Sequence, residues 1–212
     1  MKHGFKELGG WVFSKLIQHR MKSTRVLIGM ITLLMLFTRP WLLTGRLLET
    51  FLDWTGYFLV LFACLGRIFS SVFICGTKNE KLSTQGPFSM VRNPLYVFSF
   101  FAVLGAGFLS GRLIILVLLL WLFFLYYPGV VAHEETYLRQ TFGDLYETYQ
   151  NKVPRWFPRT LKMDLPEVIP MYPRLLLQTM RDTSLFFLIF PMTEVIERLH
   201  DLGMLPMFFP LM

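Results

Sequence analysis

Long apolar runs separated by short polar segments dominate the chain. The first covers about Val26 to Leu43, and the second covers about Phe51 to Cys75. A third, about Leu95 to Leu109, and a fourth, about Leu113 to Val131, are joined only by Ser110-Gly111-Arg112, which predicts a tight helical hairpin. About 20 apolar residues in a helix cross the hydrocarbon core of a bilayer. The pattern therefore predicts an all-α integral membrane protein with about four to five transmembrane helices.

Amphipathic segments flank these runs. Residues 1–24 mix lysines with apolar side chains at helical spacing, which predicts an interfacial N-terminal helix. Residues 132–160 predict a cytoplasmic helix and loop, with the helix ending before Pro154. The apolar positions of that helix follow at i, i+4, i+7 and i+11, namely Leu138, Phe142, Leu145 and Tyr149.

The C-terminal tail, residues 161–212, alternates prolines with apolar runs. This pattern leaves two interpretations open: a fifth, broken membrane segment, or an amphipathic cover over the core.

Composition agrees with a membrane protein. Hydrophobic residues make up 54% of the 212 residues and charged residues 17%, against about 45–50% and about 25% in soluble domains. Mean hydropathy is +0.49. No Gly/Ser-rich or Pro-rich linker divides the chain. We therefore expect a single domain over residues 1–212, with a transmembrane core at 26–131.

The basic residues predict the orientation in the membrane. The net charge is +7, and six Lys or Arg precede the first run, three occupy residues 76–92 and seven occupy residues 132–182. Since cytoplasmic loops are enriched in Lys and Arg, we expect the N-terminus and the active site to be cytoplasmic, in a bacterial inner membrane or the endoplasmic reticulum. No soluble basic face suited to nucleic acid is predicted.

Several enzyme classes lack their usual signals. The run from Gly105 to Gly111 predicts small-residue helix packing rather than a dinucleotide loop. No HExxH, CxxC, GxSxG or phosphate-loop motif occurs, and Cys64 and Cys75 read as buried apolar positions, so no metal site is predicted. Arg67, inside the second run, is either a snorkelling residue or a wall of a polar cavity.

Two polar stretches carry candidate chemistry. In Arg92-Asn93-Pro94, proline suits a first helical turn and Asn93 can cap that turn with its side-chain oxygen, while Arg92 can anchor it to headgroups. The predicted topology brings this stretch to the same membrane face as Glu134-Glu135. Adjacent residues point about 100° apart on a helix, so one of the two glutamates faces a given pocket.

Ordered motifs from Arg67 to Pro158 add a resemblance. The stretch "KLSTQGPFSMVRNPLY" is followed by about 37 residues of hydrophobic hairpin and then by "EETYLRQTFGDLYETYQNKVPRWFP". This order resembles the isoprenylcysteine carboxyl methyltransferase and phospholipid methyltransferase superfamily. Its members show Arg-His-Pro-x-Tyr, a membrane hairpin, Glu-Glu-x-x-Leu, Phe-Gly and Val-Pro-Arg.

The resemblance implies S-adenosylmethionine (SAM) as the cofactor and residues 132–160 as a cytoplasmic helix and loop that bind it. One of Glu134 and Glu135 would hold the cofactor's α-ammonium group, with Glu135 favoured, and Arg92 would lie by the reacting group, with Glu134 and Tyr96 as further catalytic candidates. Asn93 stands where the family usually has His and Phe88 where it often has Tyr; His133 is the nearest polar residue to a missing family arginine. The implied cofactor-binding residues are Lys81, Leu82, Ser83, Phe88, Asn93, Pro94, Leu95, Tyr96 and Glu135.

The expected activity is methyl transfer to a membrane-embedded acceptor. The leading acceptor is the carboxylate of a prenylcysteine-like or other lipophilic substrate, and the alternative is the amine of phosphatidylethanolamine. Two alternatives from other classes are disfavoured. A sterol-reductase-like enzyme would need a nicotinamide site, and the sequence has no motif for one. A transporter or scaffold would place polar residues at the midplane, whereas most charges of this chain cluster on one face. Membrane lipids and a lipid or prenylated substrate are the expected partners, and the oligomeric state stays open.

Overall fold

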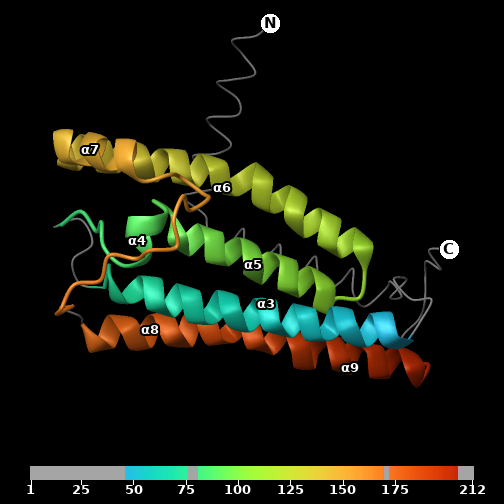
Figure 1. The fold of residues 1–212 in the computed structure, drawn as a ribbon. Helices are drawn as coiled ribbons and strands as arrows, with labels where there is room; N and C mark the ends of the chain where they lie inside the picture. The colour runs from blue at the N-terminus through green and yellow to red at the C-terminus, as the bar shows by residue number, and fades with distance from the viewer. Residues whose placement is uncertain (1–45, 76–80, 170–171, 205–212) are drawn as a thin grey trace, which may run out of the picture. The chain divides into compact units, whose positions relative to one another are not determined.

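The computed structural model describes residues 46–75, 81–169 and 172–204, which form helices and the segments that connect them (Figure 1). Within these ranges no β-strand forms, and Gly86 and Asp164 make an isolated bridge. The interfacial helix expected over residues 1–24 and the span expected at 26–43 lie outside the described residues. The helices are α3 (Arg46–Val72), α4 (Pro87–Met90), α5 (Pro94–Leu109), α6 (Leu113–Phe142), α7 (Asp144–Lys152), α8 (Pro173–Ser184), the 3-10 helix η1 (Leu185–Leu188) and α9 (Ile189–Asp201).

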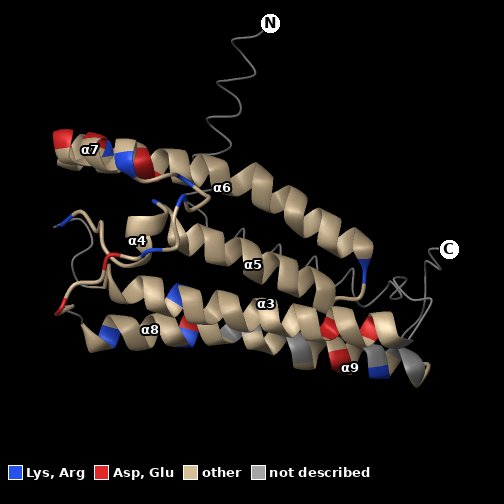
Figure 2. Cartoon of the chain, in the orientation of Figure 1, with Lys and Arg blue, Asp and Glu red and all other residues tan. Residues whose placement is uncertain are grey.

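Helices α3 and α6 are long and apolar enough to cross a membrane, and α5 is a shorter apolar helix. At 1.5 Å per residue, 27 and 30 residues span roughly 40 and 45 Å. Their outward faces expose large apolar side chains, including Phe58, Leu65, Trp121 and Phe124, which in water would be unfavourable. Figure 2 shows α5 without charges and the charges of α6 gathered beside α7. The prediction of a helical membrane protein is confirmed at this level.

Glycines set the close packing of α5. A Cβ at Gly105 would lie 2.7 Å from the backbone oxygen of Gly56 in α3, and one at Gly107 would overlap Leu116 in α6. Val60, Cys64 and Leu109 form the buried cluster between α3 and α5, with Tyr57 against it. The small-residue interpretation of Gly105 to Gly111 is confirmed, since these glycines allow the helices to approach closely.

The predicted hairpin between the third and fourth runs forms as α5, a tight connection and α6. Gly111 takes a φ of 61° there, a left-handed conformation that glycine adopts at low cost. Arg112 is fully buried and donates from Nη1 to the carbonyl oxygen of Ser110 at 2.7 Å. The connection between α5 and α6 therefore depends on the left-handed conformation of Gly111 and on the internal hydrogen bond of Arg112.

The fourth run and the helix after it differ from expectation. They form a single helix, α6, which continues to Phe142. Gly143, with a φ of 51°, ends α6 and begins α7. This turn interrupts the expected i, i+4, i+7 face, and Leu145 on that face is 69% exposed. The prediction that the helix ends before Pro154 is confirmed, because α7 ends at Lys152.

The tail continues with α8, η1 and α9. Helix α8 lies beside α3 (Figure 1), and the thiol of Cys64 donates to the carbonyl oxygen of Thr183 at 3.5 Å. Cys64 and Cys75 are both buried and free, as the apolar interpretation predicts. The described residues up to Thr193 belong to one compact unit, and α8 covers one side of α3 within it.

Candidate functional site

The segment before α5 is fixed by a backbone pairing with the loop after α7. Gly86, at φ 62°, donates its N–H to the carbonyl oxygen of Asp164 at 2.7 Å. The hydroxyl of Ser89 accepts the N–H of Asp164 at 3.0 Å. Arg92 donates its N–H to the carbonyl oxygen of Pro154 at 2.9 Å. Two loops that are far apart in the sequence thus form one end of the site.

Asn93 and Pro94 start α5 as the sequence predicts, with Asn93 at the N-cap and Pro94 in the first turn. The expected side-chain cap is wrong, because Asn93 makes no capping hydrogen bond with its side chain. Its amide instead donates from Nδ2 to Oε1 of Glu135 at 3.0 Å. An amide can donate to a carboxylate without titrating, so Asn93 links the start of α5 to α6.

A cavity of about 300 Å³ lies at this end of α5 and α6. Its walls combine aromatic rings, aliphatic groups and charged or polar side chains of both signs. The lining residues are Ile74, Lys81, Leu82, Ser83, Phe88, Arg92, Asn93, Pro94, Leu95, Tyr96, His133, Glu134, Tyr137, Leu138, Phe142 and Tyr149. Every site residue predicted from the sequence lies on this wall except Glu135.

The two adjacent glutamates have different surroundings. Glu134 lines the cavity and accepts the hydroxyl proton of Tyr96 at 2.8 Å through Oε2. Glu135 is 6% exposed and does not line the cavity. Both of its oxygens accept hydrogen bonds from Arg155, at 3.1, 3.1 and 2.5 Å. As the helical geometry requires, one glutamate faces the cavity and the other faces the neighbouring loop.

Arg92 connects the cavity to this ion-pair cluster. Its Nε lies 3.4 Å from Oε1 of Glu135, and its Nη1 donates to the carbonyl oxygen of Gln150 at 3.2 Å. The side chain is 11% exposed. A buried guanidinium held by both a carboxylate and a carbonyl has a fixed orientation, so Arg92 is a rigid part of the cavity wall rather than a headgroup anchor.

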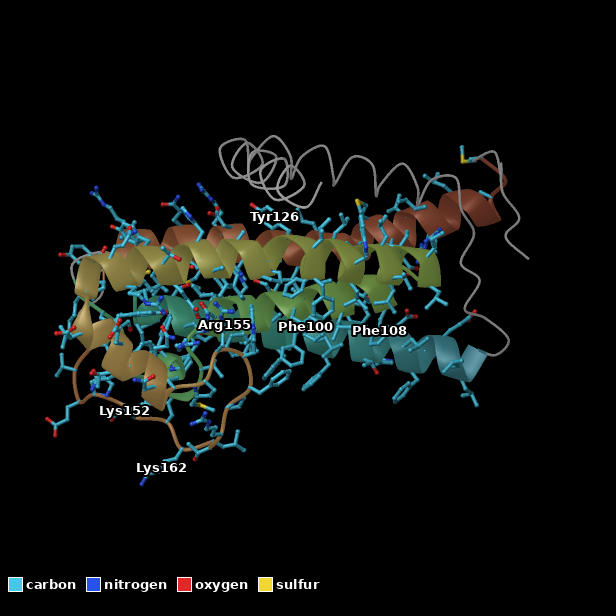
Figure 3. All side chains as sticks on the ribbon, turned by 90° about the horizontal axis from the view of Figure 1, so that it is seen from above. Phe100, Phe108, Tyr126, Lys152, Arg155 and Lys162 are labelled. Atoms are coloured by element: carbon cyan, nitrogen blue, oxygen red, sulfur yellow. The ribbon has the colours of Figure 1, made fainter. Side chains whose placement is uncertain are left out.

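Arg155 is the residue that sequence reasoning missed. It lies in "VPRWFP", and the Val-Pro-Arg motif was the signal that could have identified it. Its hydrogen bonds to Glu135 raise the pKa of the guanidinium. In Figure 3, Arg155 lies against the helices, while Phe100 and Phe108 lie farther along α5. Arg155 therefore joins the loop after α7 to the glutamate behind the cavity.

Two tyrosines of α7 close the site from the other side. The hydroxyl of Tyr149 donates to the carbonyl oxygen of Phe88 at 2.7 Å. Tyr146 is fully buried; burial, together with the negative charge of Glu135, raises its pKa to about 12. Burial also raises the pKa of Tyr149. Both phenols stay neutral near pH 7 and pack α7 against the segment around α4.

Arg67 belongs to the helix interface rather than to the cavity. Its Nη1 donates to the carbonyl oxygen of Leu95 at 3.3 Å and to the hydroxyl of Ser99. It is absent from the cavity wall. Of the two interpretations left open by the sequence, the cavity-wall role is not supported, and the side chain instead ties α3 to α5.

Comparison with known proteins finds a match to one protein family and two bacterial relatives that are named for metal resistance. Residues 47–145 match the phospholipid methyltransferase family. A cobalt-zinc-cadmium resistance protein, CzcN of Cupriavidus metallidurans, is 29% identical over 90% of this chain and 87% of its own. A nickel-cobalt-cadmium resistance protein, NccN of Alcaligenes xylosoxydans xylosoxydans, is 32% identical over 69% of this chain and 68% of its own.

A shorter match reaches an enzyme. The protein-S-isoprenylcysteine O-methyltransferase of Schizosaccharomyces pombe is 39% identical over 38% of this chain and 34% of its own. No solved structure matches. The NccN match covers more than two thirds of both chains, and the family match contains the hairpin, the Arg92 segment and both glutamates. The chain belongs to the isoprenylcysteine carboxyl and phospholipid methyltransferase superfamily.

Proposed function

We propose that this membrane protein transfers a methyl group from SAM to a membrane-embedded acceptor. The observation that carries the proposal is the cavity, since the residues that the family resemblance implies line one space, with the exception of Glu135. The leading acceptor is the carboxylate of a prenylcysteine-like or other lipophilic molecule. The protein would span the membrane several times with its cavity on the cytoplasmic side.

The cavity's donor set suits SAM. A volume of about 300 Å³ falls at the lower end of the ~300–1,000 Å³ of small-molecule sites. Phe88 and Tyr137 supply aromatic surface for an adenine ring, while Lys81 supplies a positive charge for the cofactor's carboxylate. These residues would hold the cofactor, which when bound supplies an electrophilic methyl group on a positively charged sulfur.

We propose different roles for the two glutamates. Glu134 faces the cavity and keeps one oxygen free of the Tyr96 bond, so it can accept hydrogen bonds from the cofactor's ammonium group. Glu135, favoured for that role from the sequence, has both oxygens bonded to Arg155 and one also to Asn93. The geometry therefore supports Glu135 as a positioning residue behind Asn93 and Arg92.

Positioning accounts for most of the proposed catalysis. A carboxylate acceptor is already a nucleophile and needs no base, and holding two reactants in line contributes ~7–11 kcal/mol in favourable cases. Arg92 can offer the guanidinium N–H groups that Gln150 and Glu135 leave available to such a carboxylate. Its fixed orientation would hold the acceptor without a rearrangement.

A series of aromatic rings offers a place for an apolar tail. Tyr96 on the cavity wall lies 5.5 Å from the ring of Tyr127, which lies 4.3 Å from that of Phe123. The next ring, Phe124, is 61% exposed on the outer face of α6. Apart from the hydroxyl groups of Tyr96 and Tyr127, these contacts join the cavity wall to the outer face of α6 through aromatic rings, which favours a lipophilic acceptor.

One contact favours the second acceptor class. The hydrogen bond from Tyr96 to Glu134, at 2.8 Å, places a proton acceptor on the cavity wall. Methylation of an ethanolamine headgroup requires loss of a proton from nitrogen before attack, and Glu134 could receive that proton. Phospholipid N-methylation is therefore the alternative function of the same cavity.

The two bacterial relatives are named for metal resistance. In the part of the chain that the structure describes, no group of three or more His, Cys, Asp or Glu could hold a metal ion. We propose that a role of this chain in resistance would act through methylation of a membrane component.

Calorimetry on the detergent-purified full chain tests the proposal. We expect SAM and S-adenosylhomocysteine to bind, and Glu134→Gln to weaken both. Absence of binding to the folded protein would contradict the methyltransferase function. Labelled SAM supplied with a prenylcysteine analogue, or with phosphatidylethanolamine, then identifies the acceptor by which fraction becomes methylated. Arg92→Ala should lower turnover more than cofactor affinity.

A further inference from the structure

The loop after α7 carries an exposed tip that neither the cavity nor the helix packing uses. This tip, residues 157–162, reads Phe-Pro-Arg-Thr-Leu-Lys. Phe157 is 84% exposed and Leu161 is 83% exposed. Arg159 and Lys162 between and beside them are exposed as well. Large apolar side chains are costly to keep in water, so their exposure here indicates an apolar partner.

The tip is held firmly at both ends. Just before it, Arg155 bonds to Glu135, and Pro154 accepts the N–H of Arg92. Just after it, Asp164 pairs with Gly86 and bonds to Ser89. The exposure of the tip therefore belongs to an anchored loop rather than to a frayed end.

We expect the loop to lie at the level where the apolar helices reach the membrane surface. Its anchors are the residues just before α5 and the last turns of α6, where the apolar run of α6 gives way to Glu134 and Glu135. In Figure 3, Lys162 lies on the outer part of the loop, away from the helices that carry Phe100 and Phe108. A loop at that level would extend over the headgroup region beside the helices.

We propose that the tip is an interfacial anchor that inserts into the headgroup layer of an anionic membrane. Phe157 and Leu161 would enter the boundary between headgroups and acyl chains, where apolar side chains are stable. Arg159 and Lys162 would contact anionic headgroups, which attract cations near the surface. The acidic residues Asp164 and Glu167 follow outside the tip and are exposed, and the backbone of Asp164 is bonded to Gly86 and Ser89.

The chain offers a matched control. Leu145 in α7 is 69% exposed, close to the exposure of Leu161, but its neighbours Asp144 and Glu147 are acidic. An anionic surface attracts the tip and repels this part of α7. Comparison of the two leucines therefore separates membrane insertion of the tip from general proximity to the bilayer.

The test uses the full chain in nanodiscs, with Leu161→Cys or Leu145→Cys labelled by an environment-sensitive fluorophore. We expect lipid-borne nitroxides to quench the label at 161 at least twofold more than the label at 145. This difference in quenching should be seen in nanodiscs that contain phosphatidylglycerol. It should be smaller in nanodiscs of pure phosphatidylcholine. Arg159→Gln together with Lys162→Gln should reduce it in the same way, without changing SAM binding.

Three results would overturn the inference: equal quenching at 161 and 145, quenching at 161 that is the same with and without phosphatidylglycerol, or quenching unaffected by the two Gln substitutions. Because the readout is fluorescence, it does not depend on methyl transfer. If SAM binding is never observed but the label at 161 is quenched as expected, the proposed function fails while the anchor stands.

Discussion

Asn93 and Glu135, 42 residues apart, are joined by a hydrogen bond of 3.0 Å from Nδ2 to Oε1 inside the protein. Asn93 is 7% exposed and Glu135 is 6% exposed, so water does not compete for this bond. The bond fixes the start of α5 against the last turns of α6. Asn93 and Glu134, the neighbour of Glu135, both line the cavity, so the shape of the cavity depends on this bond.

Asn93→Asp tests this bond. A second carboxylate about 3 Å from Glu135 would be repelled by it, because two buried like charges cannot both ionise cheaply. We expect a larger loss than for Asn93→Ala, which should cost roughly 1.5–3 kcal/mol as a lost bond to a charged group. Thermal unfolding in detergent measures both. Asn93→Asp should recover stability toward pH 5, since a protonated Asp donates again; no recovery would contradict the assignment.

The two glutamates should separate in stability measurements. Glu135→Gln leaves Arg92 and Arg155 without their shared carboxylate, and we expect the free energy of unfolding to fall by about 3 kcal/mol. This value is at the lower end for buried ion pairs, because the side chain of Arg155 is 40% exposed. Glu134→Gln should change stability by less than about 1 kcal/mol, since an amide oxygen can still accept the Tyr96 hydroxyl. Chemical unfolding curves of the two variants give the comparison, and equal losses would show that the assigned surroundings are wrong.

Gly105→Ala should separate α3 from α5. The added methyl group would lie 2.7 Å from the backbone oxygen of Gly56, which cannot rotate away, so we expect a loss of roughly 1–3 kcal/mol. Gly66→Ala is the matched control, because the three atoms nearest to its methyl group all belong to the side chain of Phe98. Combining Gly66→Ala with Phe98→Ala should relieve that clash, whereas no side-chain change should rescue Gly105→Ala. Melting temperatures distinguish the two cases.

Alkaline pH should destabilise the protein through Tyr146. Its pKa is raised to about 12 in the folded state, against about 10 in an unfolded chain. The neutral phenol therefore contributes stability that is fully present below pH 10 and is lost as the pH rises from 10 toward 12. We expect Tyr146→Phe to reduce the fall in melting temperature between pH 9 and pH 11. Tyr172→Phe, at a 56% exposed position, should leave that fall unchanged.

The sequence by itself determined the apolar helices, the hairpin and the family. These are local properties: an apolar run of sufficient length is a helix in lipid, because its backbone must satisfy its own hydrogen bonds there. Glycine at 111 and proline at 94 mark the helix ends for equally local steric reasons. The ordered motifs likewise identified, residue by residue, the segment that forms most of the cavity wall.

Only the tertiary structure decided which groups face one another. Helical geometry alone places Glu134 and Glu135 about 100° apart but cannot say which one meets the cavity. The left-handed turn at Gly143 redirects α7 and so exposes Leu145 while bringing Tyr149 to Phe88. The loop pairing of Gly86 with Asp164 brings Arg155 to Glu135. Such contacts join residues distant in the chain, and their distances depend on the packing of every helix between them.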